Sequence, residues 1–195
     1  MINSLEDLDL SQRYSYADYL TWQFSERIEL FKGYIRQMAA PTPKHQRVSR
    51  EFTKHFLNFF DKNTCDVFYA PLDVRLYNRK KSLLADKDVY TVVQPDISII
   101  CDSTKIDDKG CNGAPDLIIE ILSPSNPNTD IKDKYQLYQE NGVIEYWIVY
   151  PNDAVIHQYV LKEEKYYSHG IFTRQDVIVP FLFPELTIDL VDVFA

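Results

Sequence analysis

Two acidic residues stand in apolar surroundings that predict strands. Glu120 lies inside the run "LIIEIL" at 117–122, and Asp96 follows Pro95 at the start of "DISII". A carboxylate buried in a strand is unfavourable unless a cation pairs with it. If the two strands are neighbours, the two carboxylates supply the oxygen ligands that Mg²⁺ prefers. The pattern therefore predicts a divalent-metal site, with ordinary roles as the alternatives: a strand-edge acid at Asp96 and a salt bridge to a buried Arg or Lys at Glu120.

A metal ion held in this way activates water and stabilises the charge that develops on a phosphodiester. A lysine close to the scissile phosphate is then expected, and the helix predicted over 131–141, "IKDKYQLYQEN", offers two. At about 100° per residue, Ile131, Tyr135 and Tyr138 form its buried stripe. Lys134 borders this stripe, whereas Lys132 lies farther from its centre. Lys134 is the better candidate for reaching inward, and the alternative is a solvated helix lysine.

Charge is distributed unevenly along the chain. The net charge is −8, which by itself argues against a nucleic-acid partner. Residues 26–81, however, carry twelve Lys and Arg against six Asp and Glu, a net of +6, while 1–25 carry −3 and 82–195 carry −11. The basic third predicts a local anion-binding surface beside an acidic centre, although chance unevenness on solvated faces would give the same count.

The length of 195 residues indicates one domain, at most one with a small appendage. No apolar run approaches the ~20 residues of a membrane helix, and the acidic, polar start "MINSLEDLDLSQR" does not resemble a signal peptide. Three cysteines without a C-x-x-C pair indicate reduced thiols. These features predict a cytoplasmic protein that does not interact with membranes.

Apolar periodicity and turn residues predict the order of elements. Asp116 to Val149 is expected to form a β-α-β unit with a parallel strand pair, and 103–115 is expected to be a loop. The other predicted elements are a helix at 16–22 capped by Ser15, two short strands around Lys32-Gly33, an amphipathic helix at 44–63, strands at 66–78 and 92–102, a hairpin at 153–172 and an apolar terminal segment at 180–195.

Pro95-Asp96, then Glu120, with a lysine nearby, resembles the PD-(D/E)XK nuclease pattern. The chain more closely resembles the Uma-two family of restriction-endonuclease-like proteins, which is abundant in cyanobacteria. The matching stretches cover most of the chain in order: "IELFKGYI", "PTPKHQRVSREF", "PLDVRL", "VVQPDISII", "APDLIIEILSPSN", "DIKDKYQLYQENGVIEYWIVYP" and, loosely, "FPELTIDLVDVF". The combination of "PDLIIEILSPS" with "GVIEYWIV" is specific.

The resemblance implies a restriction-endonuclease-like α/β core, a mixed β-sheet flanked by helices, with an N-terminal helical and strand extension. It implies cleavage of DNA that depends on Mg²⁺ or Mn²⁺. Asp96 and Glu120 would bind the metal with the Ile121 carbonyl. The chain departs from the nuclease pattern at Leu122, where the lysine belongs, and Lys134 stands in the matching place on the helix.

The same match gives expected roles to three further positions, and the basic charge of residues 26–81 gives one to four more. Glu29 in "RIELFKG" matches a family acid and is placed near the site, while Asp73 in "PLDVRL" is a weaker candidate. His45 would contact phosphate or substrate, or serve as a capping or core histidine. Basic residues on the same predicted helix would contact backbone phosphates: Lys44, Arg47, Arg50 and Lys54.

Three functional hypotheses follow. The first is a metal-dependent DNA endonuclease, for which a homodimer is expected because two-fold symmetry suits the cutting of both strands. The second is a nucleic-acid-binding or assembly module that has lost efficient chemistry, favoured by Leu122 and the acidic bulk. The third is a buried ion pair between Glu120 and Lys134 with a structural role only.

Overall fold

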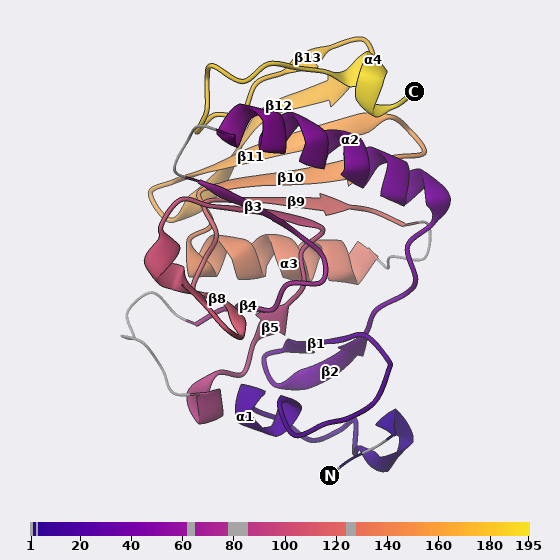
Figure 1. Cartoon of the computed structure of the whole chain (residues 1–195), viewed down its shortest axis with the longest axis vertical. Coiled ribbons are helices and arrows are strands. Elements are labelled where there is room, and N and C mark those ends of the chain that lie inside the picture. The colour runs from indigo at the N-terminus through magenta and orange to yellow at the C-terminus, as the bar shows by residue number, and fades with distance from the viewer. Residues whose placement is uncertain (1, 3, 62–64, 78–85, 124–127) are drawn as a thin grey trace.

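The computed structural model describes residues 2, 4–61, 65–77, 86–123 and 128–195. Two six-stranded sheets organise the chain (Figure 1). The central sheet has the order β12-β11-β10-β9-β6-β3, and the second sheet has the order β2-β1-β5-β4-β8-β7. The strands are β1 Ile28–Phe31, β2 Tyr34–Gln37, β3 Asp66–Tyr69, β4 Val74–Arg75, β5 Val92–Val93, β6 Ile97–Ile100, β7 Ile106–Asp107, β8 Gly110–Asn112, β9 Leu117–Ile121, β10 Glu145–Tyr150, β11 Val155–Lys162, β12 Lys165–Thr173, β13 Val177–Ile178 and β14 Ile188–Asp189.

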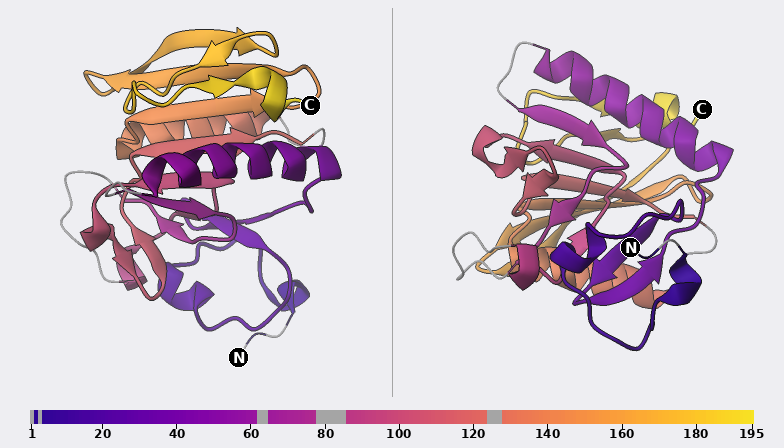
Figure 2. Two further views of the ribbon diagram at one scale, coloured as in Figure 1. Left: turned by 45° about the horizontal axis from the view of Figure 1, so that its top comes forward. Right: turned by 60° about the horizontal axis from the view of Figure 1, so that its bottom comes forward.

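Helices cover both faces of the central sheet, as the mixed-sheet prediction requires. The α-helices are α1 Tyr16–Tyr19, α2 Pro43–Phe60, α3 Asn128–Asn141 and α4 Leu190–Val193, and the 3-10 helices are η1 Leu5–Asp7, η2 Asp86–Asp88 and η3 Ser103–Lys105. α2 lies on one face and α3 on the other (Figure 1). The N-terminal elements and the C-terminal segment lie at opposite ends of the molecule (Figure 2). Within the described part of the chain, no helix has the length and apolar character needed to cross a membrane.

The expected β-α-β unit is confirmed. β9 and β10 pair in parallel, with Ile119 opposite Trp147, and α3 connects them. β9 is buried along its whole length, as a strand covered on both faces must be. Antiparallel pairing of β9 with β6 and of β10 with β11 makes the sheet mixed.

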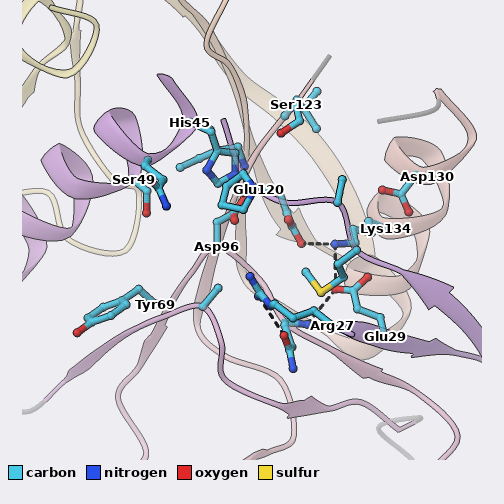
Figure 3. A pocket seen from close by; sticks show the side chains of 18 of the residues that line it. Arg27, Glu29, His45, Ser49, Tyr69, Asp96, Glu120, Ser123, Asp130 and Lys134 are labelled. Atoms are coloured by element: carbon cyan, nitrogen blue, oxygen red, sulfur yellow. Dashed lines mark hydrogen bonds and ion pairs between the residues drawn. The ribbon is translucent and has the colours of Figure 1, made fainter. Parts of the chain in front are cut away.

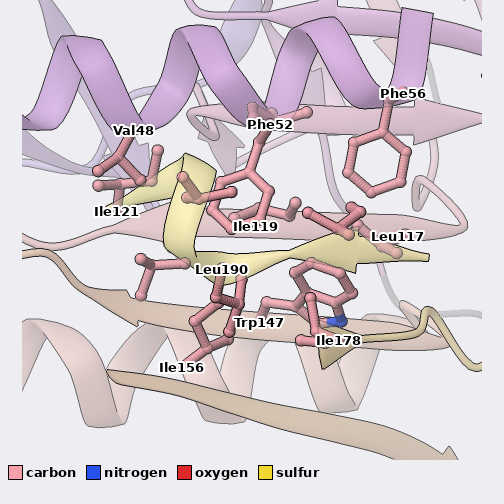
Figure 4. Packing of buried hydrophobic residues seen from close by; sticks show 14 of the residues in the cluster. Val48, Phe52, Phe56, Leu117, Ile119, Ile121, Trp147, Ile156, Ile178 and Leu190 are labelled. Carbon is pink, nitrogen blue, oxygen red and sulfur yellow. The ribbon is translucent and has the colours of Figure 1, made fainter. Parts of the chain in front are cut away.

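The apolar stripe of α2 packs on the central sheet. Thr42 caps the helix and Pro43 occupies its first turn, where the missing N–H costs nothing. Val48, Phe52 and Phe56 follow at intervals of four and face β9 and Trp147 (Figure 4). The C-terminal segment closes the same core, which confirms the expected packing of the terminal residues; its buried members are Leu186, Ile188, Leu190, Val193 and Phe194.

Four element predictions are wrong in detail. The helix expected over 16–22 ends at Tyr19, and the strand expected over 92–102 divides at Pro95 into β5 of the second sheet and β6 of the central sheet. The strand expected over 66–78 divides into β3 and β4, which belong to different sheets, because the chain turns at Pro71, a residue that has no N–H for a ladder. The loop expected at 103–115 contains η3 and the β7–β8 hairpin. Gly110 makes that hairpin possible, since a Cβ there would lie 2.3 Å from the Asp73 carbonyl oxygen.

The prediction of three reduced thiols is also wrong. Cys65 and Cys101 form a disulfide, and Cys111 is free and buried. The register of β3 and β6 explains the bond, because Asp66 pairs with Ile100 and so brings the two flanking cysteines opposite each other. An odd count without a motif gave no sign of this pairing.

Candidate active site

Strand register brings the two predicted metal-binding carboxylates together. β6 runs antiparallel to β9 with Ile97 opposite Ile119, so Asp96, which precedes β6, lies beside Glu120. The Ile121 N–H donates a hydrogen bond of 2.8 Å to Oδ2 of Asp96. Positions 24 apart in the sequence are therefore neighbours at one end of the central sheet, as the sequence predicted (Figure 3).

Glu120 is buried and is held by two donors from α3. Lys134 Nζ lies 3.0 Å from Oε1, and the Tyr138 hydroxyl donates to the same oxygen at 2.6 Å. Burial raises the pKa of the Glu120 carboxyl; the Lys134 charge opposes this rise, and the nearby carboxylates of Asp96 and Glu29 add to it. The buried acid thus has a cation partner, but it also has acidic neighbours that a single ammonium does not neutralise.

Lys134 joins Glu120 to Glu29, a residue of β1. Its Nζ lies 3.1 Å from Oε1 of Glu29, which also accepts the Gln94 N–H at 2.9 Å. Burial would lower the pKa of Lys134, but the charges of Glu120 and Glu29 outweigh burial and raise it. The ammonium is therefore held charged inside the protein, and the alternative of a solvated helix lysine is wrong.

His45 contacts Asp96 from the other face of the sheet. Its Nε2 lies 3.1 Å from Oδ2 of Asp96, and Thr42 Oγ1 accepts its backbone N–H. Burial would lower the pKa of His45, but the hydrogen bond and charge of Asp96, the charge of Glu120 and a backbone hydrogen bond with Ile121 raise it. His45 is thus a buried residue of the first turn of α2 that orients a site carboxylate.

These residues open into a pocket of about 1040 Å³ between α2, the N-terminal hairpin and α3 (Figure 3). Asp96, Glu120, Lys134, Glu29 and His45 all line it. Arg50 and Lys54 line it from α2, where each also pairs with Glu51. Lys44 and Arg47 are exposed on α2 and do not belong to the lining.

The weaker candidate Asp73 is linked to the pocket through a hydrogen bond. Gln94 Nε2 donates to Oδ1 of Asp73 at 2.9 Å, and the Tyr16 hydroxyl donates to Oδ2 at 3.0 Å. Arg27 Nη2 donates to the side-chain oxygen of Gln94 at 3.1 Å. Asp73 therefore braces Gln94, which in turn holds Glu29.

Sequence reasoning missed Gln94, Arg27, Tyr138 and Arg36. Arg36 stacks on Phe31 at 3.7 Å and forms ion pairs with Asp130 and Asp133 in the first turns of α3. These four side chains are polar residues in or beside predicted elements, a signal too common to single them out. Gln94, next to Pro95-Asp96, was the most visible of them.

The oxygen donors fit a hard cation in type. Oδ1 of Asp96 and Oε2 of Glu120 accept no hydrogen bond from any residue that the structure describes. The described residues contain no group of three or more His, Cys, Asp or Glu side chains that could enclose a metal. Two carboxylates and a carbonyl are a typical protein share for Mg²⁺, which keeps several waters.

A family model described as "Putative restriction endonuclease" matches residues 16–191. The chain belongs to the Uma2 family. The resemblance stated from the sequence is thereby confirmed, and with it membership of a restriction-endonuclease-like nuclease family.

Two proteins are similar to this Uma2 chain, one in sequence and one in structure. The Synechocystis protein slr1290, described as uncharacterized, is 26% identical over 140 residues, which are 71% of this chain and 68% of that protein. A crystal structure described as a putative nuclease belonging to DUF820, from Anabaena variabilis, superimposes with a TM-score of 0.72 over 92% of this chain and 97% of that one, at 19% identity. This likeness confirms the α/β nuclease-type fold of the Uma2 chain.

Proposed function

We propose that this Uma2 protein is an endonuclease that hydrolyses phosphodiester bonds of DNA and depends on Mg²⁺ or Mn²⁺. The observation that carries the proposal is the convergence of Asp96, Glu120, Lys134 and Glu29 on one pocket from four separate segments. Buried carboxylates clustered with one lysine in a concave site are typical of catalytic groups rather than of surface charge.

In this proposal Asp96, Glu120 and the Ile121 carbonyl hold the metal. The free carboxylate oxygens of Asp96 and Glu120 support it, because both belong to residues that line the pocket. A bound divalent cation would neutralise charge on the phosphodiester and lower the pKa of water. The Ile121 N–H and His45 fix the orientation of Asp96, and Tyr138 fixes that of Glu120.

Lys134 has the role that the missing lysine at position 122 would have. Its ammonium stays charged between Glu120 and Glu29 and lines the pocket, which suits contact with a phosphate oxygen as negative charge builds up there. Glu29 positions this ammonium. Arg50 and Lys54 would contact phosphates along the strand from the wall formed by α2.

Nicking of supercoiled plasmid with Mg²⁺ or Mn²⁺ tests the proposal. We expect Glu120→Gln, which preserves shape and removes the charge, to lower the nicking rate by about 100-fold or more. Glu185→Gln, at an exposed glutamate of the C-terminal segment, is the matched control and should nick like the wild type. Absence of nicking with both metals, or an unchanged rate in Glu120→Gln, would refute the nuclease function.

A non-catalytic DNA-binding module is the second candidate. The observation that favours it is that Lys134 pairs with both Glu29 and Glu120 while Leu122 occupies the usual lysine position. Such a module would bind DNA with a steep dependence on salt and would not nick it with any divalent metal.

Light scattering tests the homodimer that we propose along with the endonuclease.

A further inference from the structure

The outer part of the pocket supplies proposed phosphate contacts from Arg50 and Lys54 but no residue that acts in the proposed chemistry. Beyond the carboxylates it continues between α2 and the end of β3, and the residues that line this part are Ser49, Arg50, Thr53, Lys54, Leu57 and Tyr69. The whole pocket encloses about 1040 Å³. A base can stack on a side chain in this outer part only when it has left the base stack of a duplex, so an aromatic residue there would select an unpaired strand.

Tyr69 belongs to the strand end that borders Asp96. It is the last residue of β3 and pairs with Ile97, the neighbour of Asp96. The next residue, Ala70, donates its N–H to the Asp96 carbonyl at 3.1 Å, which fixes this strand end against the site. Figure 3 shows Tyr69 on the side of the pocket where Ser49 lies, away from Lys134 and Glu29.

The ring of Tyr69 has free faces. Tyr69 is 61% exposed, and among the described residues its side chain makes no ring stack, cation contact or hydrogen bond. An aromatic ring that lines a pocket with open faces provides a surface for a planar partner. Because every base has a π-face, stacking of this kind accepts any base.

α2 presents a complementary wall. Thr53, Lys54 and Leu57 lie three, four and seven positions after Arg50, so the four residues share one face of the helix. The side chains of Arg50 and Lys54 are 71% and 65% exposed, and Leu57 is 49% exposed. Cations beside an aromatic platform are the combination by which proteins hold single-stranded nucleic acid.

We propose that the DNA strand to be cut enters this site unpaired, with a base next to the scissile phosphate stacked on Tyr69 and its phosphates held by Arg50 and Lys54. The inference rests on the proposed nuclease function and names its substrate class: single-stranded DNA, or a strand locally separated from its complement. Tyr69 is a positioning residue for the substrate and takes no part in the chemistry.

Fluorescence of 2-aminopurine oligonucleotides in EDTA tests this, because binding is then measured without cleavage. We expect the wild type to bind the single strand at least ~10-fold more tightly than the same sequence in a duplex, with a change in 2-aminopurine emission on stacking. Tyr69→Ala should bind the single strand about 10- to 100-fold more weakly, the loss of one stacked base. Tyr69→Phe keeps the ring and should bind like the wild type.

Tyr167→Ala is the matched control, since Tyr167 is 51% exposed on β12 and lies outside the pocket lining. It should bind like the wild type. Equal affinity for single strand and duplex, or unchanged binding by Tyr69→Ala, would overturn the inference. Binding of a single RNA strand but not of the DNA strand of the same sequence would also overturn it. Nicking of plasmid together with a preference for duplex would refute the inference and leave the nuclease function standing. Tyr69-dependent binding without cleavage would refute the nuclease function and leave only the binding of a single strand at this site.

Discussion

At the scale of single residues, the candidate site is built around one buried ammonium between two buried carboxylates. Lys134, Glu29 and Glu120 have side chains that are 10%, 5% and 9% exposed. Removing one partner of a buried ionic group leaves the others uncompensated, which costs far more than a surface salt bridge provides. The two carboxylates that keep Lys134 charged in spite of its burial also make the site depend on it for stability.

Replacing Lys134 by Met should therefore lower both stability and nicking. The free energy of unfolding should fall by about 3–5 kcal/mol, because Glu29 and Glu120 would remain buried without a cation. Urea denaturation measures this loss. Lys132→Met, at an exposed lysine on the same helix, is the control and should change stability by no more than about 0.5 kcal/mol. Equal stabilities of the two variants would contradict the buried ion-pair assignment.

At the scale of elements, each site residue depends on an element that is anchored elsewhere. β1 brings Glu29, α3 brings Lys134 and Tyr138, and Arg36 of β2 ties the N-terminal hairpin to the first turns of α3. The predicted N-terminal extension thus supplies a wall of the pocket. β10 has a corresponding anchor: Glu145, fully buried at its start, holds the C-terminal segment.

Glu145 accepts four hydrogen bonds and has no cation partner among the described residues. Its donors are Trp147 Nε1 and Gln158 Nε2, both at 2.7 Å, and the backbone N–H groups of Phe181 and Leu182, both at 3.0 Å. Glu145→Ala would leave the Trp147 and backbone donors without this acceptor, at about 1–3 kcal/mol for each unsatisfied group and less than additively, whereas Gln158 Nε2 would keep the Val179 carbonyl at 3.0 Å. We expect a loss of at least ~3 kcal/mol in urea unfolding and faster amide exchange at 181–182.

Glu185→Ala provides the comparison for that experiment, because Glu185 is an exposed acid of the same segment. It should unfold within about 0.5 kcal/mol of the wild type. If Glu145→Ala unfolded at the same urea concentration as Glu185→Ala, the buried carboxylate would not be the anchor of the segment.

At the scale of the whole molecule, a covalent bond joins the edge strand β3 to β6, the strand that follows Asp96. Cys65 and Cys101 are separated by 36 residues, so the bond closes a long loop that includes all of β4 and β5. Closing a loop of this length in the unfolded chain stabilises the native state by about 4 kcal/mol in the chain-entropy model. The central sheet therefore does not depend on apolar packing alone at this edge.

Reduction of the disulfide should lower the melting temperature of the wild type by about 10 °C, given the loss of ~4 kcal/mol in a chain of this size. Thermal unfolding with and without a reductant measures the shift. The double variant Cys65→Ala, Cys101→Ala should melt at one temperature in both conditions. A wild type that is insensitive to reductant would show that the two thiols are not bonded.

The sequence alone determined much of the architecture and part of the site. The spacing of apolar residues predicted α2, the parallel β9–β10 pair and the C-terminal packing, because burial imposes a period on each element. Glu120 in an apolar strand required a cation, and the position of Lys134 on the margin of the α3 stripe identified one. Family resemblance added Glu29, whose role stays a prediction, and the restriction-endonuclease-like class, which the family match confirms.

Only the tertiary structure decided which residues surround these groups. The turn at Pro71 sends β4 to a second sheet, the β3–β6 register joins Cys65 to Cys101, and Gln94, Arg36 and Tyr138 reach their partners across more than one element. The spacing of residues within one element predicts none of these pairings, because each joins chain segments that come together only on folding. A sequence specifies such contacts only through the whole set of packing interactions, so the pocket beside Tyr69 became visible only in three dimensions.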